Sequence, residues 1–242
     1  SFLNVSSMII SSSNHVSIRR SLFVATWAAA TTIAASASDA TFARSLPRPA
    51  PENSQCSNLT AAPDGTLYLT YSRSGVRPGE RALCLAALAQ GAAAWLSTRI
   101  IISTPLLLEN WADFASLVVG TDGALTAQWF QKSALGASDY DGWFARSTDA
   151  GATWTKPAPL GHEFVALAPL ADGRTLAVWL ESMGMRNSDV PHAELKPDES
   201  AMPSMRLQSR LLSPDGATLG EWLVDPDVCT CCQNTLAVLP DG

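Results

Sequence analysis

Three cysteines gather within four residues near the end of the sequence, in the run Cys-Thr-Cys-Cys-Gln at 229–233. Thiolate sulfur is a preferred ligand of soft metals such as Cu(I), and zinc also binds it. The spacing therefore suits a copper or zinc site, as an alternative to the disulfide bonds that are the default in an exported protein. Its ligands would be Cys229, Cys231 and Cys232.

Two further cysteines, Cys56 and Cys84, bring the total to five, so at least one thiol is unpaired within the chain. Cys56 and Cys84 could form a disulfide, but Cys84 lies within an apolar segment, where a buried thiol is equally expected. For the clustered cysteines, disulfide bonds, a metal site and unreactive thiols all remain open. In the metal case, His162 or His192 would add a nitrogen ligand.

A carboxylate flanked by aromatic residues is the second group that could do chemistry. Asp113 lies in the run Asn-Trp-Ala-Asp-Phe at 110–114. Apolar surroundings raise the pKa of a carboxyl group, and a raised pKa suits a general acid. Asp113 is therefore a candidate catalytic residue. The alternative is that Asp113 caps a turn while the aromatic side chains fill the core.

Three arginines in expected loops could bind a substrate carboxylate through paired hydrogen bonds. Arg73 directly follows an expected strand and is the best placed of them. Arg77 and Arg186 are equally explained as solvated loop residues. Arg73 therefore joins Asp113 as a candidate catalytic residue.

The elements that would position these residues repeat along the chain. An apolar segment, an Asp-Gly pair and a second apolar segment ending in an aromatic residue occur at 59–71, 117–129 and 167–179. Asp-Gly between apolar segments is among the strongest signals for a β-hairpin. The terminal aromatics, Tyr71, Trp129 and Trp179, lie 58 and then 50 residues apart. A period near 50 residues is typical of four-stranded propeller blades.

We therefore predict an all-β fold, a β-propeller of four-stranded antiparallel blades, with about three blades here and six when complete. The blades are expected at about 58–102, 114–160 and 164–224, with a fourth starting at 235, in a domain covering 57–242. In the second blade, strands are expected at 116–119, 125–130 and 143–146, with a fourth starting at Trp154. A β-sandwich, which also alternates short strands and turns, is the alternative.

The order of strands in such blades predicts where function lies. The turns after the first and third strands share one end of the blade, and the other connections share the opposite end. The second group is longer and is expected at 72–80, 108–115, 131–141, 181–204 and 225–234. Because function tends to reside on long loops held by a rigid scaffold, we expect it at this end.

The run Ser-Thr-Asp-Ala-Gly-Ala-Thr-Trp at 147–154 suits a tight turn between the third and fourth strands of the second blade. The Asp149 carboxylate can accept hydrogen bonds from downstream backbone N–H groups, and Gly151 can adopt a positive φ. Trp154 is expected to begin the returning strand. Ser147, Asp149, Gly151 and Trp154 make a pattern that resembles the Asp-box (BNR) repeat of sialidases and related β-propellers. An ordinary hairpin loop is the alternative.

From position 110 to 235 the sequence is similar to bacterial exported sialidase-like proteins, through its Asn-Trp-Ala-Asp-Phe, Asp-box and Cys-Thr-Cys-Cys-Gln runs. The resemblance implies a glycoside hydrolase of the exo-sialidase type, with a purely structural Asp box. True sialidases use an arginine triad, a tyrosine nucleophile assisted by glutamate, and an aspartate acid/base, to which only Asp113 corresponds by position. The other groups would lie in later blades, so the sequence is expected to be an N-terminal fragment. The alternative is a non-catalytic propeller that binds a ligand, a metal or a partner.

The first 37 residues have the features of a signal peptide: a basic patch at 15–20, an apolar segment at 21–34 and an Ala-Ser-Ala cleavage site at 35–37. The apolar segment is too short to span a bilayer, so no membrane span is expected after signal removal. The Arg19-Arg20 pair resembles a twin-arginine signal, and a general secretory signal is the alternative. A Pro-rich linker is expected at 38–56, and the protein is expected to be periplasmic or secreted.

The composition and net charge limit the kinds of molecule that the protein is expected to bind. Hydrophobic residues make up 47% of the 242 residues, enough for a packed core, and 22 acidic residues against 16 basic ones give a net charge of −6. A nucleic-acid surface requires a basic patch, so nucleic acid is not an expected partner. A glycan or another small molecule is the expected ligand, and the sequence does not determine the oligomeric state.

Overall fold

The computed structural model describes residues 45–182 and 205–239. Within these ranges the regular secondary structure consists of β-strands, and none of it forms a helix long and apolar enough to cross a membrane. The expected signal peptide at 1–37 lies outside the described residues. The candidate residues Arg186 and His192 also lie outside them, in the range 183–204.

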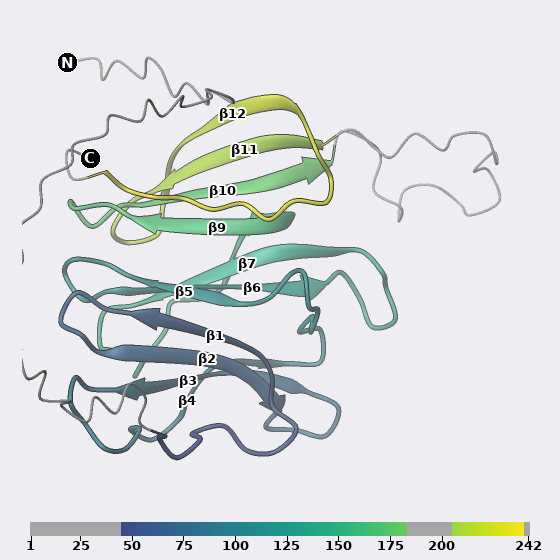
Figure 1. The fold of residues 1–242 in the computed structure, drawn as a ribbon. Coiled ribbons are helices and arrows are strands. Elements are labelled where there is room, and N and C mark those ends of the chain that lie inside the picture. The colour runs from purple at the N-terminus through teal and green to yellow at the C-terminus, as the bar shows by residue number, and fades with distance from the viewer. Residues whose placement is uncertain (1–44, 183–204, 240–242) are drawn as a thin grey trace, which may run out of the picture. The chain divides into compact units, whose positions relative to one another are not determined.

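Twelve strands in the described ranges form three four-stranded antiparallel sheets, each with its strands side by side in chain order (Figure 1). The first sheet contains β1 (Gln55–Ala61), β2 (Leu67–Ser74), β3 (Arg81–Leu88) and β4 (Arg99–Thr104). The second contains β5 (Ser116–Val119), β6 (Leu125–Lys132), β7 (Tyr140–Ser147) and β8 (Ala158–Gly161). The third contains β9 (Glu163–Pro169), β10 (Thr175–Ser182), β11 (Met205–Leu212) and β12 (Thr218–Val228).

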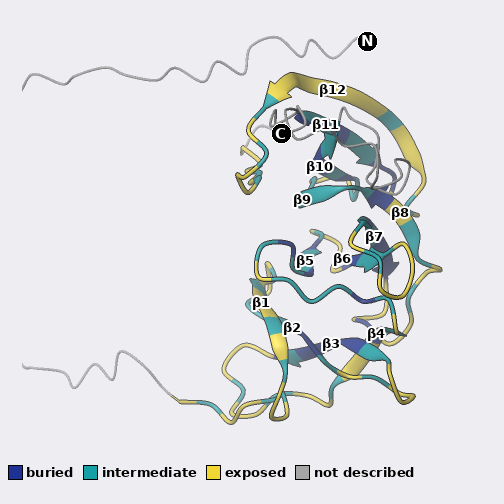
Figure 2. Cartoon of the chain, turned by 90° about the vertical axis from the view of Figure 1, so that its right-hand side faces the viewer, coloured by how far each residue is buried: buried dark blue, intermediate teal, exposed yellow. Residues whose placement is uncertain are grey.

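The three sheets are consecutive blades of a β-propeller. Their first strands meet, since β5 contacts both β1 and β9. At the other side of the third sheet, β12 is exposed over most of its length (Figure 2). Three sheets in series, joined through their first strands, confirm the predicted all-β propeller of four-stranded blades and exclude the two facing sheets of a sandwich.

The core fills the spaces between successive sheets. Leu83 and Leu85 of β3 pack with Leu117, Leu125 and Trp129 of the second sheet in one buried cluster. A second buried cluster joins the second sheet to the third. Its buried members are Phe144, Leu160, Leu167, Ala177 and Leu212. Burial of apolar side chains between blades is thus the main force that fixes each sheet against the next.

The hairpin turns between first and second strands share one geometry. In each, the glycine of the Asp-Gly pair has a positive φ, as at Gly65 (80°) and Gly123 (79°). The aspartate accepts a hydrogen bond from the backbone N–H two residues later, over 2.9 Å for Asp64 and 3.0 Å for Asp122. The same turn occurs at Asp215-Gly216 between β11 and β12. Local side-chain chemistry therefore sets these hairpins.

The turn at 147–154 has the side-chain hydrogen bonds that its residue types predict. The Asp149 carboxylate accepts bonds from the Thr153 backbone N–H (2.8 Å) and from the hydroxyls of Thr153 (2.6 Å) and Ser147 (2.7 Å). Gly151 has a φ of 84°, as predicted. The prediction that Trp154 begins the fourth strand is wrong, because β8 begins only at Ala158, after a proline that interrupts the pairing. Trp154 instead packs against the core between the first two sheets.

The Asp149 carboxylate leads to a prediction about acid stability. Its hydrogen bonds with Thr153, and then with Ser147, lower the pKa of Asp149 from 3.8 to about 2. A lowered folded-state pKa stabilises the fold above the unfolded value, and this contribution is lost as the pH falls from about 4 through about 2. Asp149→Ala should therefore lower the melting temperature by a few degrees at pH 6. The difference should shrink steadily in melts recorded towards pH 2, whereas the exposed Glu52→Gln control should match the wild type throughout.

Candidate functional site

The long connections lie at the end of the sheets opposite the turn at 147–154, as the antiparallel order requires. Asp113 precedes β5, and β7 begins beside it at Tyr140 and ends at Ser147, where the turn that holds Asp149 starts. Asp113 and Asp149 therefore lie at opposite ends of the second sheet. The clustered cysteines share the end that holds Asp113, because nearby Gln233 donates a hydrogen bond to the Ala112 carbonyl.

Asp113 links three elements of the fold. Its side chain is buried, with only 3% exposed. The Tyr140 hydroxyl donates to Oδ2 over 2.6 Å, and the Phe164 backbone N–H donates to Oδ1 over 3.0 Å. The carboxylate therefore ties the connection before β5 to the starts of β7 and β9. Both of its oxygens are engaged by protein donors.

Phe164 holds an unusual backbone conformation at this junction. Its φ is 51°, in the left-handed region that a bulky residue seldom occupies. The hydrogen bond to Asp113 on one side and one from the Asn234 amide to the Phe164 carbonyl (2.8 Å) on the other hold this conformation. Strained backbone held by its surroundings concentrates at functional sites, which points to this junction as one.

A cluster of titratable groups surrounds the Asp113 carboxylate. Its other members are Tyr140, His162 and Glu163. The His162 ring stacks on Tyr140 with centroids 5.7 Å apart, and its Nε2 lies 3.6 Å from Glu163 Oε1. Burial raises the pKa of Tyr140, and the hydrogen bond to Asp113 raises it further, so the phenol stays protonated as a donor. Burial also raises the pKa of Glu163; the Asp113 charge adds to this shift and His162 opposes it. Glu163 is therefore prepared to hold a proton at a higher pH than an ordinary glutamate.

A pocket of about 220 Å³ lies beside this cluster, between β5, β6, β9 and the segment that follows the cysteines. Asp113, Gln128 and Asn234 contribute polar side chains to its wall. Gln128 is 1% exposed, and its Nε2 donates to the Phe114 carbonyl (2.9 Å) and to the Ser116 hydroxyl (3.0 Å). Its Oε1 has no protein partner in the described residues. Because a buried acceptor without a partner is costly, this oxygen is suited to accept a hydrogen bond from a bound molecule.

A second, more open hollow of about 430 Å³ adjoins the same end, along Gln55, Glu109, Asn110 and Trp111. The Trp111 side chain is 92% exposed, which is unusual for an indole. Glu109 is held in place by an ion pair with Arg81 over 2.6 Å. An exposed aromatic face beside fixed polar groups is a common feature of sites that bind amphipathic ligands.

The candidate arginines are not gathered around Asp113. Arg73 lies within β2 and does not follow it, because the β2–β3 pairing continues to Ser74 and Arg81. Its guanidinium donates to the Ser74 carbonyl over 3.2 Å. Arg77 is exposed and lies 4.0 Å from Glu80. Among the described residues, neither arginine makes a hydrogen bond or an ion pair with Asp113. The role of Arg73 in catalysis stays a prediction.

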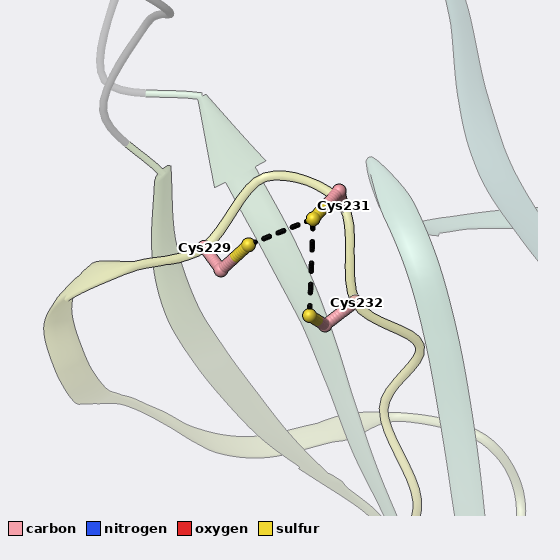
Figure 3. A group of neighbouring side chains, drawn as sticks. All are labelled: Cys229, Cys231 and Cys232. Carbon is pink, nitrogen blue, oxygen red and sulfur yellow. Dashed lines mark hydrogen bonds between the residues drawn. The ribbon is translucent and has the colours of Figure 1, made fainter.

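The five cysteines are free thiols (Figure 3 shows the clustered three). Cys84 is buried in β3, and Cys56 donates to the Asn110 carbonyl over 3.6 Å. The clustered thiols are exposed and directly follow β12. This strand ends at Val228, so the loop begins after residue 228 and not at the predicted position 225. Their three sulfur atoms lie within 4.8 Å of one another. His162 is not part of this group, since it lies beside Glu163.

Comparison with known proteins returns no family model and no curated sequence that matches the chain. Among solved structures, an alpha-L-arabinanase of Penicillium chrysogenum complexed with arabinobiose shares 14% identity at a TM-score of 0.45, covering 74% of this chain and 52% of that one. The NanB sialidase of Streptococcus pneumoniae shares 15% identity at a TM-score of 0.41, covering 71% and 24%. An alpha-L-arabinofuranosidase of Fusarium graminearum shares 15% identity at a TM-score of 0.39, covering 68% and 52%. The chain thus spans about half or less of the length of these structures.

Tyr140, Glu163 and Gln128 were not among the sequence candidates for the site. Tyr140 and Glu163 each begin a strand at the long-connection end, and each is a titratable residue next to another one. Their place at this end of the sheets was the available signal, since Asp113 was expected at the same end. No comparable signal exists for Gln128, because its role depends on a missing partner that only the packed structure reveals.

Proposed function

We propose that this chain is the N-terminal part of an exported, sialidase-like propeller protein that hydrolyses glycosidic bonds at the end of the sheets that holds Asp113. The observation that carries the proposal is a pair of carboxyl groups in one cluster: Asp113 accepts the hydrogen bond of Tyr140, and Glu163 lies beside His162, whose ring stacks on Tyr140. Glycosidases commonly use two carboxyl groups in different protonation states beside the bond that breaks. The Asp-box turn and the sequence features of an exported protein support the same assignment.

Each group has a role in this proposal. Glu163, with its raised pKa, donates a proton to the oxygen of the leaving group. Asp113 supplies a second carboxylate, which stabilises the positive charge that develops on the sugar, and it is oriented by Tyr140 and by the Phe164 N–H. Tyr140 is a poor nucleophile because its raised pKa disfavours the phenolate, so the nucleophile is assigned to later blades of the complete protein.

The two hollows give the proposal a place for a glycan. The unpartnered Gln128 Oε1 can accept a hydrogen bond from a sugar hydroxyl in the pocket beside Asp113. The exposed Trp111 indole offers an apolar face on which the ring of a neighbouring sugar can lie. Trp111→Ala is consequently expected to weaken glycan binding while leaving the fold intact.

A second candidate function is glycan binding without catalysis. It is favoured by the hydrogen bonds of Asp113, since both carboxylate oxygens already accept from protein donors. In that case Asp113 is a structural link between blades, and the pocket and Trp111 bind the ligand alone. The two functions differ in whether a bound glycoside is cleaved.

We expect the complete protein to release the fluorophore from a fluorogenic sialoside or a related glycoside. Glu163→Gln should lower kcat by about 100-fold or more, because it removes the proton donor. Activity should fall as the pH rises through the raised pKa of Glu163, and this descending limb should disappear in the variant. Initial rates between pH 4 and pH 9 provide the measurement.

Asp172→Asn, in a hairpin turn at the opposite end of the sheets, is the control and should keep wild-type turnover. Turnover no higher than that of Asp113→Asn across a panel of glycosides would remove the catalytic proposal. Glycan binding without turnover, weakened by Trp111→Ala, would establish the second function in its place.

A further inference from the structure

The three clustered thiols are positioned as a ligand set that the glycosidase proposal does not use. Cys229 Sγ lies 2.9 Å from Cys231 Sγ, and Cys231 Sγ lies 3.9 Å from Cys232 Sγ (Figure 3). All three are exposed, so a metal ion can reach them from solvent. The three sulfurs point toward one another from a short bend in the chain (Figure 3).

We propose that Cys229, Cys231 and Cys232 bind one Cu(I) ion in a three-coordinate thiolate site. Three sulfurs at about 2.3 Å from a common metal are about 4 Å apart, so the observed set needs only a small opening between Cys229 and Cys231. Soft thiolate ligands select Cu(I). A structural zinc site is almost always four-coordinate, and no fourth histidine, cysteine or carboxylate ligand joins the set within the described residues.

The site is tied to the pocket by the residues that follow it. The Gln233 amide donates to the Ala112 carbonyl, next to Asp113, and the Asn234 amide donates to the Phe164 carbonyl over 2.8 Å. Gln233 and Asn234 also form part of the pocket wall. A metal that fixes the bend at Cys231 and Cys232 therefore restricts the segment that closes one side of the pocket. Cu(I) is thus a structural ion that orders this wall, independently of whether the protein cleaves glycans.

The test uses the complete protein, reduced and kept without oxygen, titrated with Cu(I) against a coloured Cu(I) chelator. We expect one Cu(I) per chain and a thiolate-to-metal absorption band in the ultraviolet. Each of Cys229→Ser, Cys231→Ser and Cys232→Ser should lower the affinity by more than the roughly tenfold that loss of an outer-shell partner costs. Cys56→Ser, which removes a thiol from the first sheet, should bind Cu(I) like the wild type.

Amide hydrogen exchange provides a second measurement. Cu(I) bound to a single surface thiol would leave the exchange rates of the neighbouring segment unchanged. Cu(I) should slow exchange of the amides at 230–236 in the wild type and in Cys56→Ser, and not in Cys231→Ser. Reduced protein that binds well below one Cu(I) per chain, or that prefers Zn(II) over Cu(I), would overturn the proposal. So would a Cys229–Cys231 disulfide that resists reduction in the folded protein and leaves no free ligand set.

Discussion

Trp129→Ala is expected to destabilise the protein by about 3 to 5 kcal/mol, the usual cost of deleting a fully buried large aromatic side chain. Trp129 lies in the middle of β6 with no exposed surface and packs in the cluster between the first and second sheets. Its removal leaves a cavity at the contact that fixes one blade against the next. The indole Nε1 has no hydrogen-bond partner in the described residues, so lost packing accounts for the effect.

Denaturant unfolding of the complete protein, followed by circular dichroism, measures this loss. Trp129→Phe should cost far less, because it refills most of the volume and removes an unpaired buried N–H group. Trp111→Ala is the matched control, since its side chain is 92% exposed, and should change stability by about 0.5 kcal/mol at most. Equal losses in Trp129→Ala and Trp111→Ala would show that the contact between the first two blades does not depend on this cluster.

Gly161→Ala is expected to destabilise the protein by about 2 to 3 kcal/mol through overpacking. Gly161 ends β8, and a Cβ added there would lie 2.5 Å from Cδ2 and 2.7 Å from Cδ1 of the Trp179 indole. Two contacts hold the Trp179 ring in place, so it cannot easily move away from the added methyl group. Its Nε1 donates to Glu181 over 2.8 Å, and the Arg210 guanidinium lies over its ring at 5.2 Å. The glycine is required for close approach of the second and third blades.

A double-mutant cycle isolates this contact. In a Trp179→Leu background the smaller side chain leaves room for the methyl group, so Gly161→Ala should cost less than about 1 kcal/mol. The thermal or denaturant midpoint of all four proteins gives the coupling energy. The same cost in both backgrounds would refute the steric explanation.

The repeated hairpins and the turn at 147–154 were predictable because their interactions are local. The hydrogen bonds of Asp64 and Asp122 reach two residues along the chain, and those of Asp149 reach at most four. The residue types at those positions therefore determine the turns, whatever the rest of the chain does. Apolar segments between such turns then specify strands, and their period specifies blades.

The exact ends of strands were less predictable because pairing between strands decides them. Arg73 falls inside β2 because its partner strand β3 extends as far as Arg81. Trp154 falls outside β8, since the proline at 157 interrupts the ladder before the strand begins, and its ring packs against the core between the first two sheets. These outcomes depend on register and on the adjacent sheet, neither of which a single segment encodes.

By itself, the sequence determined the strand-and-turn repeat, the all-β propeller class and the end at which the long connections lie. The tertiary structure decided which side chains meet there. The bonds from Tyr140 and Phe164 to Asp113 span 27 and 51 residues, and the bond from Asn234 to Phe164 spans 70. Contacts over such separations form only after the blades pack at a definite angle, and that angle depends on the summed packing of buried side chains such as Trp129 and Trp179.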